Sequence, residues 1–352
     1  MSFLFENINK QYLARLPFVV YAKPNSNKIT AVLQKDAALH LLENEEDKGF
    51  VLASFDGSKK VLIPADKANV YFENWDEKSF YFDTEIDSEF SITDKEKFEN
   101  LVTKALQAIV DNNFTKVVLS RAEIHAIDSV DVQRIFQKLM AAYPSAFNYI
   151  FYHPEIGFWI AATPERLLNR IRNTIQTVSL AGTQVFSENL VWQEKEINEQ
   201  AIVTQYIIDV LNDFSKEVAI SKPYTQQAGQ LAHLKTDIKA TCKTDVSVIQ
   251  LVEALHPTPA VCGFPKDKAM KFIVENEGYN RSFYAGFLGE WNIDFTTFEV
   301  GNYDLYVNLR CVHINDTQAT LFVGCGINLG SNPEKEFIET VNKSKTIKKV
   351  IK

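Results

Sequence analysis

Two stretches of the sequence each carry a pair of glutamates three residues apart, Glu196 with Glu199 and Glu336 with Glu339. If each stretch is a helix, both members of a pair lie on one face of it. Four carboxylates brought together repel one another unless a cation lies among them, and hard oxygen ligands suit Mg²⁺. The spacing is therefore compatible with a magnesium site. The alternative is that all four acids face water, which is the usual position of glutamate on helices.

A glycine-rich segment precedes the second of these pairs. We expect a short buried strand at 320–323, then a turn, and then a helix that begins at Pro333 with Ser331 or Asn332 as its N-cap. A turn that leads into a helix N-terminus leaves backbone N–H groups free to bind an anion. Lys343 lies on the same helix face as the acids. An ordinary turn followed by a solvated helix is the alternative. The glycines of the predicted turn are Gly324, Gly326 and Gly330.

Four further residues have side chains suited to binding or to proton transfer. Arg310, in a predicted strand at 305–314, offers a bidentate fork for a carboxylate, although a surface arginine is equally common there. Lys116 opens an apolar strand, where a desolvated lysine can serve as a base and a solvated one is more usual. Glu165 follows a Thr-Pro turn and is either an acid of raised pKa or a turn carboxylate. His256 ends an apolar helix, whose C-terminal dipole it would complement.

Several familiar catalytic and cofactor motifs are missing from the sequence. No G-x-S-x-G segment is present, which excludes the serine-hydrolase elbow. The glycines of the predicted turn do not have the spacing of a dinucleotide fingerprint, and no βαβ unit surrounds them. The four cysteines are scattered without a C-x-x-C pair, which argues against a zinc site and against a disulfide framework.

Composition sets the class of protein. Hydrophobic residues make up 46% of the 352 residues and aromatic residues 12%, which is enough for a large core. The net charge of −8 and the single basic run at 343–352 give no reason to expect a nucleic-acid partner. No apolar run reaches the roughly 18 residues of a membrane span, and the first 24 residues do not have the pattern of a signal peptide. We therefore expect a cytoplasmic protein without membrane contact.

The order of the predicted elements favours an α+β fold, because strands come in consecutive groups with helices between the groups. Residues 1–92 look like short strands and hairpins, and a capping box at Thr93–Glu96 would open a helix. We place a boundary at 92/93. The other predicted helices are 131–143, 194–214, 246–255 and 266–275, and the other predicted strands are 116–126, 147–153, 158–162, 174–180, 283–291 and 319–323, the last forming a hairpin with 305–314.

Seven segments of the sequence, in order and at fitting spacing, resemble the chorismate-binding enzymes, and among them most closely the isochorismate synthases. The resemblance covers residues 93–352 and implies a catalytic domain there, with residues 1–92 as a variable, β-rich part of the same fold. It also implies large antiparallel sheets in a sandwich-like core flanked by helices, as in anthranilate synthase component I. The segments are KVVLSR (116–121), ATPERLL (162–168), SLAGT (179–183), HPTPAVCGFPK (256–266), FYAGFLG (283–289), LRC (309–311) and FVGCGI with SNPEKEFIET (322–340).

The resemblance implies a role for each candidate residue. Lys116 would activate the water that attacks C2 of chorismate, and Glu165 would protonate the departing C4 hydroxyl. Glu199 and Glu339 would bind Mg²⁺ directly, and Glu196 and Glu336 would support it through water. The residues expected to hold the substrate's carboxylates are Arg310, Tyr284, Lys343 and the backbone of Gly324 and Gly326, and those expected to line the ring pocket are Gly182, Thr183 and His256.

Single positions separate the related activities. Anthranilate and aminodeoxychorismate synthases use ammonia and lack a lysine where Lys116 stands, and the latter typically carry a nucleophilic lysine in place of Ala181. Salicylate synthases share Lys116 and Glu165 but go on to eliminate pyruvate, and they usually lack the His-Pro-Thr-Pro-Ala order that begins at His256. The resemblance therefore implies an isomerase that converts chorismate reversibly to isochorismate with Mg²⁺.

Two alternatives stay open on the sequence alone, a salicylate synthase and a non-catalytic module that binds an aromatic acid. The intact pair Lys116 and Glu165 argues against a pure binding module, which needs neither residue. No glutamine amidotransferase subunit is expected, and the acidic, mixed surface is compatible with a monomer. The pathway that the product feeds, whether menaquinone, siderophore or another, is not set by these residues.

Overall fold

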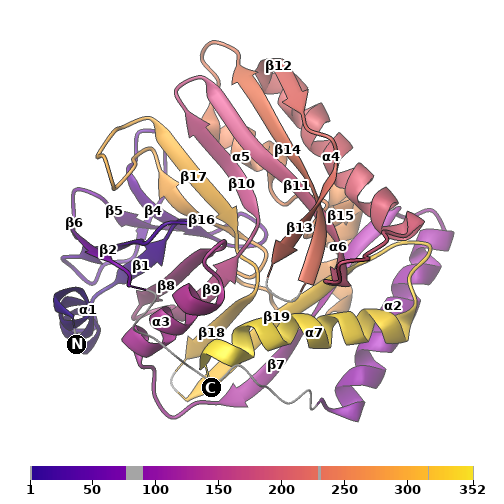
Figure 1. Ribbon diagram of the computed structural model, residues 1–352, viewed down its shortest axis with the longest axis horizontal. Coiled ribbons are helices and arrows are strands. Elements are labelled where there is room, and N and C mark those ends of the chain that lie inside the picture. The colour runs from indigo at the N-terminus through magenta and orange to yellow at the C-terminus, as the bar shows by residue number, and fades with distance from the viewer. Residues whose placement is uncertain (1, 77–89, 229–230, 316, 352) are drawn as a thin grey trace.

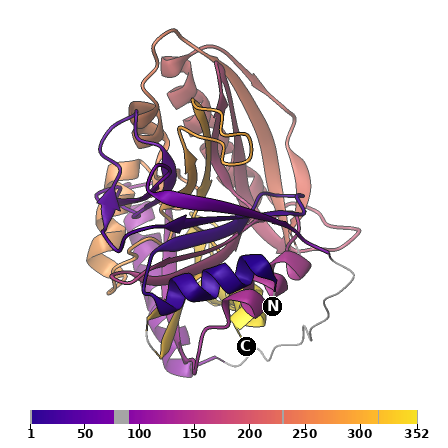
Figure 2. The same cartoon turned by 90° about the vertical axis from the view of Figure 1, so that its left-hand side faces the viewer.

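Two large antiparallel sheets share one hydrophobic core in the computed structural model, which describes residues 2–76, 90–228, 231–315 and 317–351 (Figures 1 and 2). The strand order of the first sheet is β15-β7-β19-β18-β9-β8-β1-β2-β6. The order of the second is β12-β14-β11-β10-β17-β16-β4-β5-β3, with β13 paired to β14. Helices flank both sheets, so the predicted α+β fold is confirmed. None of the helices in the described ranges is long and apolar enough to span a membrane.

The elements have the following bounds. The first sheet contains β1 (Phe18–Ala22), β2 (Lys28–Gln34), β6 (Ala68–Asn74), β7 (Lys116–Ala126), β8 (Phe147–His153), β9 (Gly157–Thr163), β15 (Gly263–Phe264), β18 (Cys311–Asn315) and β19 (Gln318–Ile327). The second contains β3 (His40–Leu41), β4 (Gly49–Ala53), β5 (Lys60–Pro64), β10 (Arg166–Ile171), β11 (Thr174–Val185), β12 (Ser215–Ile220), β13 (Tyr224–Ala228), β14 (Leu231–Cys242), β16 (Phe287–Trp291) and β17 (Asn302–Val307). The helices are α1 (Phe3–Leu13), α2 (Ile92–Val110), α3 (Val132–Ala142), α4 (Glu194–Phe214), α5 (Val248–Leu255), α6 (Lys266–Asn276) and α7 (Pro333–Ile351).

The neighbouring strands β2, β1, β8 and β9 of the first sheet are buried on both faces, which explains their continuous apolar runs. Alternate side chains of a strand point to opposite faces. In β1, Val19 and Tyr21 enter the core between the sheets, whereas Phe18 and Val20 enter a second core under α1 and α3. Figure 2 shows α1 lying below the N-terminal strands of this sheet. The alternation of apolar and polar residues that marks a half-exposed strand is therefore absent here.

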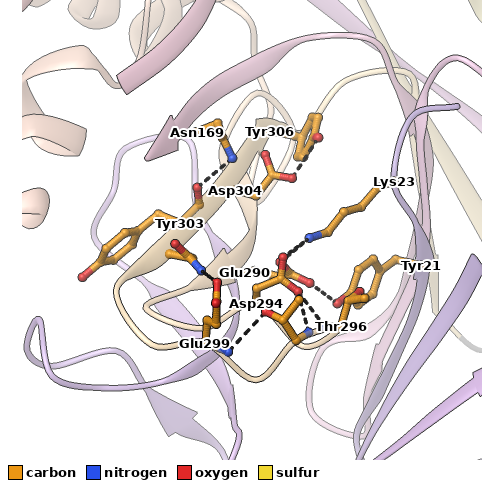
Figure 3. Close-up of polar contacts among 12 residues, drawn as sticks. Tyr21, Lys23, Asn169, Glu290, Asp294, Thr296, Glu299, Tyr303, Asp304 and Tyr306 are labelled. Atoms are coloured by element: carbon orange, nitrogen blue, oxygen red, sulfur yellow. Dashed lines mark hydrogen bonds and ion pairs between the residues drawn. The ribbon is translucent and has the colours of Figure 1, made fainter. Parts of the chain in front are cut away.

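The first 74 residues supply strands to both sheets, and a buried polar cluster ties the two together (Figure 3). The Tyr21 hydroxyl donates to Glu290 on β16 at 2.5 Å, and the Lys23 ammonium lies 2.6 Å from the same carboxylate. Burial raises the pKa of Glu290 to about 7 against the opposing effect of Lys23. The boundary predicted at 92/93 stays a prediction, and residues 77–89 before it lie outside the described residues.

Two predicted element boundaries are corrected by the structure, and a predicted hairpin is confirmed. Helix α2 begins at Ile92, because the Ser91 hydroxyl accepts the N–H of Asp94 and caps it two residues before the predicted Thr93. The predicted strand at 305–314 is two strands in different sheets, β17 and β18, and Arg310 lies between them with a φ of 51°. The predicted hairpin of β18 with β19 is confirmed.

The glycine turn predicted from the sequence also differs from what the structure shows. Strand β19 continues to Ile327, so that Gly324 and Gly326 are strand residues opposite Ser120 and Val118 of β7. The turn before α7 begins only after Ile327, and Asn332 accepts the N–H of Lys335 at its end. The missing side chains of the two glycines therefore create space on the sheet.

Helices α4 and α7, which carry the two acid pairs, pack near each other on the sheets. Helix α4 packs on β11 and β14, and α7 packs on β19 and α2 (Figure 1). Lys195 of α4 forms an ion pair with Glu336 of α7, and the Asn328 amide before α7 donates to the carbonyl of Lys195 at 3.5 Å. Residues 133 and 141 positions apart in sequence are thereby brought to one side of the molecule.

Candidate active site

A pocket lies where β11, β14 and β19 meet helices α4 and α7, and most of the residues singled out from the sequence line it. Its wall also includes Ala181, and Lys116 lies directly behind it. A larger cavity of about 720 Å³ lies beside α6 and contains none of the predicted site residues, so size alone does not identify the site. The predicted residues that line the pocket are Glu165, Gly182, Thr183, Glu199, Tyr284, Arg310, Gly324, Gly326, Glu339 and Lys343.

Ion pairs between lysines and glutamates fill part of this pocket. The fully buried Lys116 ammonium lies 3.0 Å from Glu199 Oε1, and the Lys343 ammonium lies 2.7 Å from Glu339 Oε1. Burial opposes ionisation of Glu199, but Lys116 prevails and holds the pKa of that carboxyl below its usual value. Because buried charges are costly without partners, these pairs are what permits two carboxylates to face an enclosed pocket.

Gly326 and Gly324 let these side chains approach the sheet. A Cβ at Gly326 would lie 2.2 Å from Glu199 Oε1 and 3.1 Å from Lys116 Cε. A Cβ at Gly324 would lie 2.8 Å from the Tyr284 hydroxyl. The Gly324 carbonyl also accepts a hydrogen bond from Lys343 at 3.0 Å. Any larger residue at either position would displace a polar group of the pocket.

Glu165 is a buried carboxyl group without an ion-pair partner in the described part of the chain. It follows β9, and its backbone carbonyl accepts the N–H of Val307 at 2.9 Å, which fixes the segment between the sheets. Burial raises the pKa of Glu165 to about 8, with Lys116 and Lys343 acting in the opposite direction. The carboxyl group is therefore largely protonated at neutral pH and is able to donate a proton.

Arg310 is a half-buried guanidinium whose hydrogen-bond partners are neutral, with the carboxylate of Glu339 farther off. Its Nη1 donates to Thr346 Oγ1 at 3.2 Å, and its Nη2 lies 3.0 Å from His233 Nε2. No carboxylate of the described ranges forms an ion pair with it, and burial lowers its pKa. A buried charge left uncompensated in this way creates a strong preference for an anion. Its left-handed backbone, with φ of 51°, is a strained conformation of the kind found at functional sites.

Tyr284 and the bulge of β11 at Gly182 complete the wall of the pocket. The Tyr284 ring is stacked on Phe322, with centroids 5.3 Å apart, and its hydroxyl points at Gly324. Gly182 has a φ of 71°, and a Cβ there would lie 2.9 Å from Glu196 Cβ, so the bulge packs directly on α4. Thr183 follows it with its hydroxyl 3.2 Å from His233 Nδ1.

Besides Lys116, three predicted residues lie outside the pocket wall. Glu196 accepts the N–H of Gln193 and caps α4. Glu336 is buried against Lys195, and burial followed by the charge of Glu339 raises its pKa. His256 lies in a different cavity, where its Nε2 donates to the Phe55 carbonyl at 3.0 Å and burial lowers its pKa to about 4. The structure therefore does not bring His256 to the ring pocket, because this hydrogen bond holds it elsewhere.

Two residues of the site were not found from the sequence. His233 on β14 contacts both Gly182 and Arg310. Lys195 on α4 adds a third ammonium beside the acids, and although burial disfavours its charge, Glu336 raises its pKa. A histidine within the apolar run Leu231–Leu234 was the available signal for the first. Nothing in the sequence distinguished Lys195 from other helical lysines.

The donor set of the pocket fits one magnesium ion shared with an anionic ligand. Within the described ranges, no three His, Cys, Asp or Glu side chains gather around a common point as a metal site. Mg²⁺ commonly takes only one or two protein carboxylates and completes its shell with ligand and water oxygens. Glu199 and Glu339 supply two carboxylates to one pocket, and the buried Oε2 of Glu336 has no hydrogen-bond partner among the described residues. The magnesium site stays a prediction.

Comparison with known proteins assigns the family. The family model of chorismate-binding enzymes matches residues 57–352, which is most of the chain. The chain therefore belongs to the chorismate-binding enzymes, as its motifs predicted. The match begins before the predicted boundary at 92/93 and includes all the residues of the pocket.

Individual relatives agree with this assignment. The isochorismate synthase EntC of Escherichia coli is 29% identical over 269 residues, which are 73% of this chain and 67% of that protein. A solved structure described as a 2,3-dihydroxybenzoate-specific isochorismate synthase of Bacillus anthracis has a TM-score of 0.79 at 23% identity, covering 98% of this chain and 99% of that one. Anthranilate synthase component I of Streptococcus pneumoniae has a TM-score of 0.68 at 18% identity, covering 94% and 92%. The two structures confirm the predicted fold.

A first prediction concerns the glycine under the ion pair. Gly326→Ala should displace the Glu199 carboxylate from Lys116, because the new Cβ would overlap Oε1, and should weaken chorismate binding about tenfold. The matched control is Gly330→Ala, whose Cβ would meet nothing closer than 3.7 Å. Titration calorimetry in magnesium-containing buffer measures the affinities. Equal affinity of the two variants would contradict the role given to Gly326.

Proposed function

We propose that the protein is an isochorismate synthase, which moves a hydroxyl group of chorismate from C4 to C2 reversibly and with Mg²⁺. The proposal is supported by the family and by the names of the relatives above. The observation that supports it most directly is that one pocket has both a candidate proton donor and a candidate base. Glu165 is a carboxyl group protonated at neutral pH, and Lys116 is a buried amine behind the same pocket.

These two groups account for every proton and water molecule in the proposed reaction. Lys116, an ammonium beside Glu199 in the structure, must first give up its proton; the neutral amine then takes a proton from a water molecule, whose oxygen bonds to C2 of the substrate ring. The double bonds shift, the bond from C4 to its hydroxyl breaks, and Glu165 gives that hydroxyl a proton so that it leaves as water. One water enters and one leaves, so that the reaction is an isomerisation. Two proton-transfer groups and no nucleophilic side chain are needed, which agrees with Ala181 in the pocket wall.

Cations in the pocket suit a substrate with two carboxylates. The Arg310 guanidinium lacks an ion pair in the described part of the chain, and the Lys343 ammonium lies beside it in the wall. Glu199 and Glu339 would hold Mg²⁺, with Glu196 and Glu336 acting through water. When bound, this ion supplies positive charge to the ring carboxylate while electrons shift through the conjugated system.

The proposal extends to partners and location. Water is the incoming nucleophile, so no glutamine amidotransferase subunit is required to deliver ammonia. We propose a cytoplasmic monomer, a location consistent with four cysteines that are all free and buried. A salicylate synthase is the second candidate, because it would use the same Lys116 and Glu165 before eliminating pyruvate.

The products distinguish these candidates. With chorismate and Mg²⁺ we expect isochorismate without pyruvate, and chelation of the metal with EDTA should stop the reaction until Mg²⁺ is restored. Chromatography of the reaction mixture with a coupled pyruvate assay measures both products. Formation of salicylate and pyruvate would favour the second candidate, and binding of chorismate without turnover would contradict both.

Removal of the proposed base should separate catalysis from binding. Lys116→Ala should lower kcat by at least about a hundredfold, the lower end of general-base contributions, which is a larger effect than the roughly tenfold loss of chorismate affinity expected when Glu199 loses its ion-pair partner. Lys116→Gln serves as a second variant, because it keeps a polar side chain of similar length at this buried position without an amine that can act as a base. The control is Lys239→Ala on the exposed face of β14. Wild-type rates in both Lys116 variants would show that another group is the base.

The proton donor predicts a pH dependence. Glu165 donates only when protonated, and its pKa is raised to about 8, so kcat/KM should fall about tenfold per pH unit above that value. Glu165→Gln should retain only a low rate and lose this alkaline limb. Initial rates between pH 6 and about 9.5 at fixed ionic strength test the limb. A flat wild-type profile through pH 9 would contradict the assignment.

A further inference from the structure

A second cavity lies beside α6, outside the proposed active site. It has a volume of about 720 Å³, and its wall comes mainly from segments far apart in the sequence, at 54–59 between β4 and β5, at 155–159 around the start of β9, and at 278–283 after α6. Sites for small molecules typically measure roughly 300–1,000 Å³. The proposed reaction uses none of these residues, so the cavity is free to bind a separate ligand.

Aromatic side chains form the floor of this cavity, which is the buried part of its wall. Phe55, Trp159 and Phe283 are each no more than 5% exposed. Trp159 meets Phe283 edge to face with ring centroids 5.6 Å apart, and the His313 ring is stacked on Trp159 at 5.0 Å. Rings fixed in this way present faces and edges to a further ring. The floor therefore suits a flat aromatic ligand.

Two charged groups of the wall already have partners within the protein. The Arg281 guanidinium forms an ion pair with Glu277 and also donates to two backbone carbonyls. Asp56 Oδ1 accepts from the Ser54 hydroxyl at 2.5 Å, and from the N–H and the hydroxyl of Ser58 at 3.0 and 2.8 Å. Neither group therefore needs a ligand to satisfy it.

Lys59 is the cation that remains available at the rim of the cavity. Its side chain is exposed, and its ammonium forms no ion pair in the described part of the chain. Asn280 adds a neutral donor, because its Oδ1 accepts the N–H of Ser282 at 2.7 Å and leaves its amide N–H groups free to donate. Glu155, the remaining acid of the rim, is exposed to water, which screens its charge. An ammonium and an amide donor beside an aromatic floor match the carboxylate of an aromatic acid.

The cavity and the proposed active site share a layer of aromatic rings. Trp159 belongs to the wall of the cavity, and Phe322 and Tyr284 belong to the wall of the active-site pocket. Phe322 is stacked on both of the other rings, with centroids 5.5 Å from Trp159 and 5.3 Å from Tyr284. Because such rings are close-packed, a ring that moves on one side displaces the next.

The backbone makes a second connection between the two sites. Phe283 lines the cavity, and its neighbour Tyr284 lines the active-site pocket. The Phe283 carbonyl accepts a hydrogen bond from the Asn308 amide at 2.9 Å, and Arg310 follows two residues later. Tyr284 and Arg310 are both expected to hold carboxylates of the substrate. A ligand that presses on Phe283 would therefore shift groups of the active site.

We propose that the cavity beside α6 is a second binding site, for an aromatic carboxylate. The ring lies on the aromatic floor and the carboxylate pairs with Lys59. Binding of this acid changes the affinity of the active site for its substrate through the shared aromatic layer, and such coupling between two binding sites is reciprocal. The identity of the active-site substrate rests on the proposed function, whereas the binding of the aromatic acid does not.

Titration calorimetry with 1-hydroxy-2-naphthoate tests the binding. The protein is first equilibrated with excess chorismate and Mg²⁺, so that the active site is filled and the second site is free. We expect one bound acid per chain, and 1-naphthol, which has the same rings without the carboxylate, should bind about fivefold more weakly. Lys59→Met should weaken binding of the acid by a similar factor, whereas Lys48→Met, at an exposed lysine outside the cavity, should not. Equal affinity for the acid and for 1-naphthol would contradict the place given to the carboxylate, as would wild-type affinity in Lys59→Met.

A variant with a filled cavity distinguishes this site from the active site. Val274 lies in the cavity wall and is 69% exposed, so Val274→Trp places a bulky ring there without removing a core contact. We expect this variant to lose binding of the acid while its thermal unfolding midpoint stays that of the wild type. The matched control is Val110→Trp, at a 59% exposed position on α2 outside the cavity. Undiminished binding in Val274→Trp would overturn the proposal.

Initial rates test the coupling between the sites. At saturating acid, the KM for chorismate should change by at least about twofold in the wild type and in Val110→Trp, and should not change in Val274→Trp. An unchanged KM in the wild type would overturn the coupling, and competition that persists in Val274→Trp would show that the acid acts in the active site. If the binding pattern holds but the product is not isochorismate, the proposed function fails while the second site stands.

Discussion

The burial of charge between helices α4 and α7 and strand β7 is the constraint on which the rest of the site depends. An ionised group removed from water costs several kcal/mol unless a partner compensates it. Lys116 meets this requirement for Glu199, Lys343 for Glu339 and Lys195 for Glu336. The last pair joins the two acid-bearing helices directly. The same ion pairs therefore determine both how these helices pack on the sheets and how charge is distributed in the pocket.

Two buried groups depart from this rule, and both are suited to chemistry. Glu165 has no ion-pair partner in the described ranges and remains protonated to about pH 8. Arg310 has neutral hydrogen-bond partners and occupies a strained backbone conformation. The first group can donate a proton, and the second can bind an anion. Both groups lower the stability of the folded protein, and the large hydrophobic core that the two sheets share offsets this cost.

The predictions that failed share a physical cause. Local sequence preferences alone predict a continuous strand around Arg310 and a turn at Gly324. In the structure the chain leaves one sheet for the other at Asn308–Arg310, because the side chain of Asn308 bonds Tyr149 and Phe283 from two different segments. Gly324 and Gly326 remain in β19 because β7 pairs with them, and their missing side chains admit Tyr284 and Glu199. Such partners are remote in sequence and cannot be inferred from local pattern.

The sequence by itself determined the periodic elements, the acid pairs, the fold class and, through its motifs, the family. These follow from apolar spacing and from residue types that only a few positions of a fold accept. The tertiary structure decided which side chains meet. It placed His233 beside Arg310 and His256 elsewhere, because each ring is held by a hydrogen bond to a distant segment. It also decided protonation, since the pKa of Glu165 depends on how completely two sheets and a pocket wall exclude water from one carboxyl group.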